Sequence, residues 1–135
     1  MARDEKTVAQ TFADYIQTFQ TLTPKAIVRY FHTPCMLISA PGVVVLTNPS
    51  DIEMLVGRIM GDLKARGYGR SELTDLQVSQ IGETVACVSV NRVRYKTDGQ
   101  ELERLGETYT LRNSDGGWKI VVATIHDPGI ILRAA

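Results

Sequence analysis

Apolar residues recur with helical spacing in the first part of the chain and with a two-residue alternation in the last part. The first pattern predicts an amphipathic helix over residues 4–20 with one apolar stripe. The members of this stripe are Val8, Phe12, Tyr15, Ile16 and Phe19. Thr23 then offers a capping hydroxyl just before Pro24, so we predict a short second helix over residues 24–30.

A change of pattern after Phe31 predicts a small β-hairpin. Residues 35–39 (CMLIS) and 43–46 (VVVL) are short apolar runs, and Pro41-Gly42 between them is a turn signal. Asn48-Pro49 repeats the combination of cap and proline, and helical spacing then continues to about Arg66. We therefore expect a third, longer helix after the hairpin.

The rest of the chain has the pattern of four strands joined by short turns. We predict strands over residues 70–81, 84–96, 100–113 and 118–127. The segments between them contain Gly82, Asp98-Gly99 and the run DGG at 115–117, which are turn signals. Short turns pair neighbouring strands, so the four form an antiparallel meander. We see no repeat or linker, and we expect a single domain over residues 1–135.

This order of elements predicts an α+β fold in which three helices pack across the concave face of one curved, antiparallel sheet. A long twisted sheet covered on one face makes a cone whose interior can be a ligand pocket. Large apolar side chains are the candidates for lining it, namely Phe12, Phe19, Met36, Met54 and Trp118. The alternative is that these side chains simply fill the core.

Composition limits the kinds of molecule that this protein can bind and indicates its cellular compartment. Fifteen basic and fifteen acidic residues cancel, and no cluster of Lys or Arg is present, which argues against nucleic-acid binding. No apolar run has the length of a membrane span, and the charged N-terminus is unlike a signal peptide. Cys35 and Cys87 lack metal or redox spacing, so we expect free thiols and a cytoplasmic location.

Two stretches give the chain a family resemblance. They are GETYTLRNSDGGWKIVVATIHDPG at residues 106–129 and YFHTPCMLISAPG at residues 30–42. With the aromatic face of the first helix, they resemble the cone-shaped fold of nuclear transport factor 2, ketosteroid isomerases, scytalone dehydratase and SnoaL-like polyketide cyclases. The resemblance covers nearly the whole chain. It implies a fold rather than one activity, because this fold carries many functions.

The resemblance to ketosteroid isomerases implies a general-base aspartate just before the proline after the first strand. Ala40 occupies that position here, before Pro41, which disfavours this chemistry. Those isomerases also polarise a carbonyl with a tyrosine and a protonated aspartic acid. Tyr15 on the first helix is the candidate tyrosine, or else a core aromatic. Asn91 takes the place of the acid and can donate a hydrogen bond but cannot titrate.

His126 is the first candidate for a general base. Alternation along its strand places Trp118, Ile120, Val122, Thr124 and His126 on one face. If that face is concave, His126 ends the pocket, with Asp127 pointing to the opposite side. An imidazole there can move protons near neutral pH. The simpler interpretation is a histidine at the strand end that bonds a backbone carbonyl.

His32 is the second candidate, because its segment leads into the predicted pocket wall. With His126 it could make a dehydratase-like pair, for which Asp14 or Asp51 would be the carboxylate. Capping of the second helix is the simpler role for His32. The two histidines lack metal-ligand spacing, so the sequence predicts no metal and no cofactor.

The opposite face of the sheet is the predicted partner surface. Alternation separates Ala86, Val88, Val90, Arg92 and Arg94 from the face of Asn91, and it separates Val121, Ala123 and Ile125 from the face of His126. We predict that these residues face outward, that the arginines pair with Glu83, Glu101, Glu103 and Glu107, and that the apolar part joins a homodimer. The alternative role of the arginines is to bind an anion.

The sequence therefore predicts a protein that binds a small, largely apolar molecule. It could be an isomerase, dehydratase or cyclase for a carbonyl compound, with His126, Tyr15 and Asn91 in the site. The alternative is a module without catalysis, for ligand binding or dimeric assembly, and the missing aspartate at Ala40 favours it.

Overall fold

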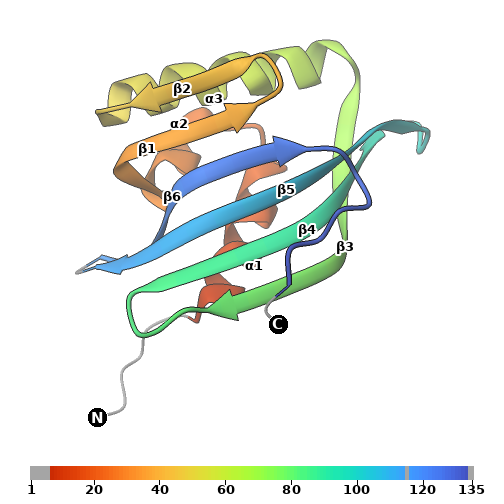
Figure 1. The fold of residues 1–135 in the computed structure, drawn as a ribbon. Helices are drawn as coiled ribbons and strands as arrows, with labels where there is room; N and C mark the ends of the chain where they lie inside the picture. The colour runs from red at the N-terminus through yellow and green to blue at the C-terminus, as the bar shows by residue number, and fades with distance from the viewer. Residues whose placement is uncertain (1–6, 115, 134–135) are drawn as a thin grey trace.

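The computed structural model describes residues 7–114 and 116–133 and confirms the predicted α+β fold class. Its elements follow the predicted order along the chain (Figure 1). They are α1 (Val8–Phe19), α2 (Pro24–Ile27), η1 (Val28–Tyr30), β1 (Phe31–Ser39), β2 (Gly42–Leu46), α3 (Pro49–Ala65), β3 (Tyr68–Gln80), β4 (Val85–Lys96), β5 (Glu101–Ser114) and β6 (Gly117–His126). The predicted second helix is split, because its last turn is a 3-10 helix. Residues 4–6 of the predicted first helix lie outside the described residues.

Capping side chains fix where the two longer helices begin. Thr7 accepts a hydrogen bond from the backbone N–H of Gln10, and the Gln10 side chain accepts one from the backbone N–H of Thr7. Asn48 caps α3 in a similar way through the N–H of Asp51, with Pro49 at the first helical position. Both helices bury one apolar stripe, which places them against the sheet.

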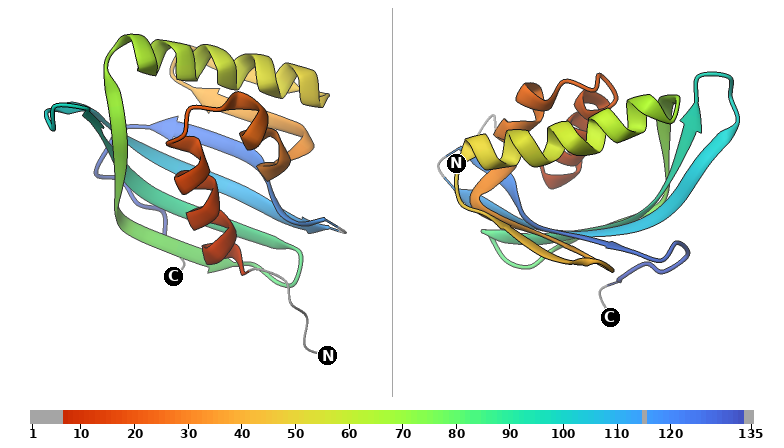
Figure 2. Two further views of the ribbon diagram at one scale, coloured as in Figure 1. Left: turned by 180° about the vertical axis from the view of Figure 1, so that it is seen from behind. Right: turned by 90° about the horizontal axis from the view of Figure 1, so that it is seen from above.

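The sheet has six strands in the order β2-β1-β6-β5-β4-β3. The predicted meander is present, since β3, β4, β5 and β6 pair antiparallel in sequence. The β1–β2 hairpin joins this meander through parallel pairing of β1 with β6, which the sequence pattern does not predict. The sheet curves, and the helices lie across its concave side (Figure 2).

A bulge in β6 changes the faces on which its side chains lie. Thr110 pairs with Val122, but the next residue, Leu111, pairs with Ile120. Val121 is therefore an extra residue, and the alternation of β6 shifts by one there. Ile120 faces the core before the bulge and Ala123 faces it afterwards, which leaves His126 on the convex side. The prediction of one continuous face from Trp118 to His126 is wrong for this reason.

The two faces of β4 are also the reverse of the prediction. Val88 and Val90 are buried in the core, and Arg92 and Arg94 follow them on the same, concave face. Asn91 lies on the convex face, where it donates to Asp75 and accepts from the N–H of Gly129. Alternation along β4 was correct, but it does not tell which set faces the helices.

A directed chain of hydrogen bonds crosses the convex face. The Nδ1–H of His126 donates to the Asp127 carbonyl (3.0 Å), and in the neutral imidazole Nε2 then accepts from the Thr108 hydroxyl (2.8 Å). Thr108 lies 2.9 Å from the Ser89 hydroxyl, which accepts from the N–H of Leu132 (2.9 Å). Side chains of three strands thus hold the C-terminal segment across the sheet.

Gly106 should tolerate no side chain beneath this segment. A Cβ atom there would lie 2.5 Å from the His126 ring and 2.5 Å from the Asp127 carbonyl oxygen. We expect Gly106→Ala to lower the free energy of unfolding by about 1–3 kcal/mol, as overpacked sites do, in a denaturant titration. Gly61→Ala is the matched control. It meets nothing within 4 Å on α3 and should be neutral or stabilising. Equal stability of the two variants would contradict this placement of His126.

Candidate ligand-binding site

A cavity of about 360 Å³ lies between the concave face of the sheet and the helices α1 and α3. Its size is within the range of small-molecule sites. Most of its wall is apolar, and this part comes from β1, β2, α3, β5 and β6. The apolar lining residues are Phe31, Cys35, Met36, Leu37, Leu46, Ile52, Leu55, Val56, Ile59, Leu105, Ala123 and Ile125.

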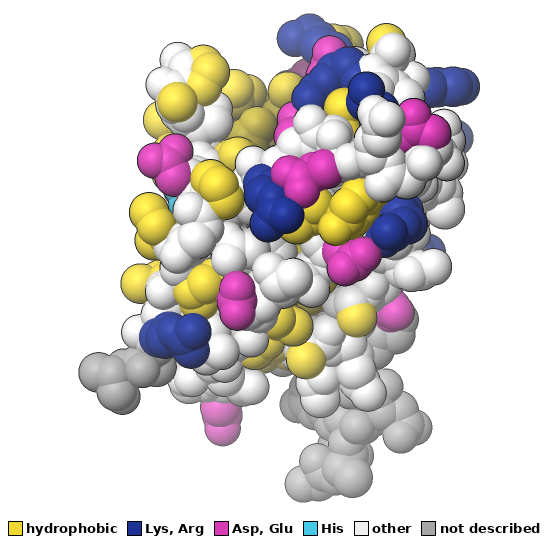
Figure 3. All heavy atoms as spheres, turned by 90° about the vertical axis from the view of Figure 1, so that its right-hand side faces the viewer, with side chains coloured by type: hydrophobic (Ala, Val, Ile, Leu, Met, Phe, Trp, Pro, Cys, Tyr) yellow, Lys and Arg dark blue, Asp and Glu magenta, His cyan; other side chains and the backbone are white. Residues whose placement is uncertain are grey.

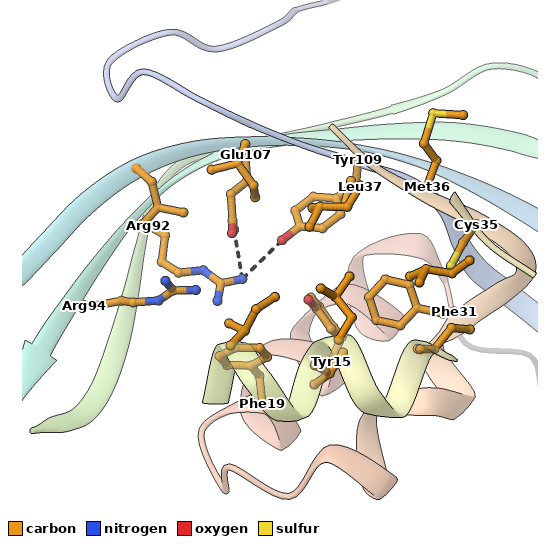
Figure 4. Close-up of a pocket in the computed structure, with 18 of the residues that line it drawn as sticks. Tyr15, Phe19, Phe31, Cys35, Met36, Leu37, Arg92, Arg94, Glu107 and Tyr109 are labelled. Carbon is orange, nitrogen blue, oxygen red and sulfur yellow. Dashed lines mark hydrogen bonds and ion pairs between the residues drawn. The ribbon is translucent and has the colours of Figure 1, made fainter. Parts of the chain in front are cut away.

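Charged side chains gather at one end of the cavity, on β4 and β5 (Figure 4). Arg92 is only 1% exposed, and its Nη2 lies 2.8 Å from Oε1 of Glu107, which is 2% exposed. The same Nη2 donates to the hydroxyl of Tyr109 at 3.3 Å. Tyr15 and Phe19 of α1 close this end from the helix side. The result is a polar end in an otherwise apolar cavity.

A second ion pair leads from this end to the surface. Arg94 donates to Oε2 of Glu103, and Arg66 donates to Oε1 of the same carboxylate, both at 2.5 Å. Arg66 also pairs with Asp62 at 3.0 Å. Burial opposes the ionised form of Glu103, but the hydrogen bonds from Arg66 and Arg94 outweigh it and lower the pKa of Glu103. Figure 3, which views the right-hand side of Figure 1, shows basic and acidic side chains around apolar atoms.

Several buried polar atoms of the charged lining residues have no hydrogen-bond partner among the described residues. They are Nε of Arg92, Nε of Arg94 and Oε1 of Glu107. Oε1 of Glu107 is close to Arg92 and forms an ion pair with it, but without the geometry of a hydrogen bond. Buried donors and acceptors are nearly always paired in proteins, so unpaired ones beside a cavity indicate groups that are available to a bound molecule.

The tyrosines at the polar end are protonated hydrogen-bond donors. Burial raises the pKa of Tyr15, although the positive charge of Arg92 opposes this. Burial, with the negative charge of Glu107, raises the pKa of Tyr109 still further. Burial opposes the charge of Arg92, but Glu107 and the surrounding tyrosines outweigh it, so the pKa of Arg92 is raised. The polar end therefore combines cationic guanidinium groups and neutral hydroxyls with the carboxylate of Glu107.

The predicted pocket residues lie in three environments. Tyr15, Phe19 and Met36 are among the lining residues, although the Met36 side chain points away from its neighbours Cys35 and Leu37 (Figure 4). Phe12 and Trp118 belong to the buried core and do not line the cavity. Met54 is 58% exposed on α3. The structure therefore brings together only part of the predicted set.

The predicted acid–base residues do not meet in the cavity. His126 and Asn91 lie on the convex face, where both hold the C-terminal segment. His32 is near the surface, with Nδ1 2.9 Å from the carbonyl of Pro34 and Nε2 3.1 Å from Arg112. Of the predicted catalytic set, Tyr15 alone lines the cavity. The bulge in β6 accounts for the position of His126, and the inverted faces of β4 account for that of Asn91.

The charged residues of the site were predicted to lie outside. Arg92, Arg94, Glu103 and Glu107 face the interior, while Arg104, paired with Glu101, is at the rim. One signal could have located them. Arg92 and Arg94 continue the phase of Val88 and Val90, and β-branched residues are typical of buried strand positions.

Within residues 7–114 and 116–133 no group of three or more His, Cys, Asp or Glu residues could hold a metal ion. Cys35 and Cys87 are free thiols, as predicted. No helix in the described part of the chain is long and apolar enough to cross a membrane. The cytoplasmic location stays a prediction.

Sequence comparison gives the family. A model for the family described as "NTF2-like protein (DUF6841)" matches residues 4–128. The chain belongs to this NTF2-like family. The resemblance in the sequence analysis is thereby confirmed. Among curated proteins, no sequence matches the chain significantly.

Solved structures share this NTF2-like fold at low identity. An NTF2-like protein with a cystatin-like fold from Novosphingobium aromaticivorans is 18% identical, with a TM-score of 0.69 over 86% of this chain and 76% of that one. Aln2 from a Streptomyces species is 18% identical, with a TM-score of 0.72 over 89% and 87%. An NTF2-like protein from Streptomyces avermitilis, whose description proposes a dehydratase, is 14% identical, with a TM-score of 0.70 over 91% and 94%. These likenesses show the fold alone.

Cys35 offers a chemical test of the cavity wall. Burial raises the pKa of its thiol to about 11, and only the thiolate is reactive. In a Cys87→Ser variant, we expect alkylation of Cys35 by iodoacetamide to be slow near pH 8 and to rise about tenfold per pH unit as pH approaches this pKa. Mass spectrometry measures the rate, and Cys35→Ser, which leaves only Cys87, is the control. Alkylation of Cys35 near pH 8 as fast as that of a free cysteine would exclude a buried thiol there.

Proposed function

We propose that this NTF2-like protein binds a small, largely apolar molecule in the cavity, with an oxygen-bearing group of that molecule at the polar end. The observation that carries the proposal is the combination of an apolar wall with buried, unpartnered Nε–H groups of Arg92 and Arg94 at one end. Small-molecule sites commonly combine apolar lining with a few polar groups that set orientation. Tyr15 and Tyr109 add hydroxyl donors beside the arginines.

Conversion of the bound molecule would use Glu107 rather than the histidines. The predicted isomerase, dehydratase or cyclase needs a proton acceptor within the cavity, and His126 lies on the convex face. Glu107 is a buried carboxylate that lines the cavity, with Oε1 free of a hydrogen-bond partner in the described structure. Arg92 and the tyrosine hydroxyls would stabilise an oxyanion that forms on a carbonyl group.

Filling the cavity tests the binding proposal. Ala123 is buried on the cavity wall, so Ala123→Phe should remove space for a ligand. We expect the wild type to bind Nile red, a neutral apolar dye, with increased fluorescence, and Ala123→Phe to lose at least about tenfold in affinity. Ala40→Phe, at the exposed turn between β1 and β2, is the matched control and should bind as the wild type does.

Circular dichroism shows whether each of these variants is folded. If Ala123→Phe does not fold, Ile59→Phe fills the cavity from α3 instead. Undiminished dye binding by a folded, filled variant would exclude this cavity as the site.

Dimeric assembly is the second candidate, and the convex face favours it. Strand pairing places Val45, Met36, Val122, Thr110 and Cys87 in one row across five strands. The next row contains Val43, Ile38 and Thr124, and its continuation through Thr108 and Ser89 lies beneath the C-terminal segment. Neither row contains a charged residue, and apolar faces of this kind often mark protein interfaces. This surface replaces the predicted one, because Val88, Val90, Ala123 and Ile125 face inward.

A charge on this face should prevent the proposed homodimer. Val45 is 58% exposed, so Val45→Glu costs little in the monomer but would bury a charge in a dimer. In size-exclusion chromatography with light scattering, we expect a wild-type dimer and a Val45→Glu monomer. Ile81→Glu, at an exposed position outside both rows, should remain dimeric. A monomeric wild type would exclude the assembly candidate without affecting the cavity.

A further inference from the structure

Two arginine side chains lie together at the polar end of the cavity. Arg92 and Arg94 alternate on β4 and share one face, and both guanidinium groups lie near the ring of Phe19. The guanidinium carbons are 5.3 Å and 5.6 Å from the centre of that ring. Both side chains are buried, so water screens their charges poorly.

The neighbouring carboxylates leave both arginines incompletely paired. Glu107 contacts Arg92 through Nη2, and Glu103 divides its two oxygens between Arg94 and Arg66. The Nε–H groups of Arg92 and Arg94 have no hydrogen-bond partner among the described residues. A buried, unsatisfied polar group costs about 1–3 kcal/mol, and more if it is charged. The fold retains two such donors beside the same cavity.

Only Glu103 and Glu107 contribute carboxylates to the cavity wall, and Glu103 is shared by Arg94 and Arg66. Arg104 also lines the cavity, but it is paired with Glu101 at the rim. The remainder of the wall is mainly apolar, so no other lining side chain supplies a negative charge. A carboxylate group offers two charged acceptor oxygens, which matches the two unpartnered Nε–H donors of Arg92 and Arg94.

We infer that the polar end is a carboxylate site and that the ligand is a monocarboxylate with an apolar body. This inference rests on the proposed binding function and specifies the head group of its ligand. The two oxygens of a carboxylate accept hydrogen bonds from the Nε–H groups of Arg92 and Arg94. Such charge-assisted hydrogen bonds between arginine and carboxylate are strong. The apolar body extends along β1, β6 and α3. A neutral head group accepts from these donors without the added strength of a charge-assisted bond, and the two guanidinium groups repel an ammonium group.

A series of probes with one apolar chain and three head groups tests the inference. Octanoate, octanol and octylamine are compared by isothermal titration calorimetry on the wild type at neutral pH. We expect octanoate to bind at least about tenfold more tightly than octanol, as a charge-assisted hydrogen bond would give, and octylamine to bind most weakly. In Arg94→Gln, the preference for octanoate over octanol should fall to within about threefold while octanol binding is retained.

Two further variants distinguish a charge change at the polar end of the cavity from a charge change elsewhere on the protein. Glu103→Gln removes a negative charge but keeps Arg94, so it should strengthen octanoate binding and weaken octylamine binding. Because Glu103 is partly exposed, this variant also provides the test if Arg94→Gln does not fold. Arg70→Gln is the matched control, since Arg70 pairs with Glu72 on the exposed part of β3, and it should leave the series unchanged.

The outcomes distinguish this inference from the function on which it rests. If octanol binds as tightly as octanoate, the carboxylate site is wrong but the apolar binding function stands. If Arg94→Gln and Glu103→Gln both leave the preference unchanged, octanoate binds elsewhere and the inference is also overturned. If neither the octyl compounds nor Nile red bind to the wild type, the proposed binding function fails as well.

Discussion

The buried ion pair between Arg92 and Glu107 is the constraint on which the interior of this protein depends. Both residues are on the concave face of adjacent strands, almost without exposure, and each is costly to bury alone. Loss of one partner from such a pair typically costs about 3–5 kcal/mol, because the remaining charge has no water. The pair therefore requires Arg92 on β4 and Glu107 on β5 to stay on the concave face. Tyr15 and Phe19 of α1 line the same cavity next to this pair.

The two faces of the sheet consequently have different tasks. The concave face changes from an apolar core under α1 to a cavity with a charged end under α3. The bulge at Val121 lets β6 serve both regions, because Ile120 packs in the core and Ala123 faces the cavity. The same bulge turns His126 to the convex face, where it binds Thr108 and the start of the C-terminal segment. A histidine that suggested catalysis thus has a structural role in the observed hydrogen bonding.

The sequence predicts the order and type of the elements well, because local signals determine them. Thr23-Pro24, Asn48-Pro49 and the glycine turns mark boundaries that the structure confirms within a few residues. Which face of a strand points to the core is decided by tertiary packing rather than by local sequence signals. In β4, Val88 and Val90 lie on one face and Cys87, Ser89 and Asn91 lie on the other. Alternation alone does not tell which of these faces is buried.

The candidate site was largely missed for the same reason. A single extra residue at Val121 reversed the assignment of His126, and no glycine or proline within residues 118–126 indicates the bulge. Arg92 and Glu107 are charged, so they were expected outside, and only tertiary pairing makes their burial tolerable. Tyr15 was located correctly within the interior, since the helical stripe of α1 requires it to face the sheet.

The NMR signals of the arginine Nε–H groups test most directly whether Arg92 and Arg94 bind the head group of a ligand. Selective labelling of arginine gives one resonance for each ordered Nε–H, and point variants assign those of Arg92, Arg94 and Arg70. On titration with octanoate, we expect the signals of Arg92 and Arg94 to shift together and saturably, while that of Arg70 does not move. Saturable octanoate binding that leaves the Arg92 and Arg94 signals in place would contradict this expectation.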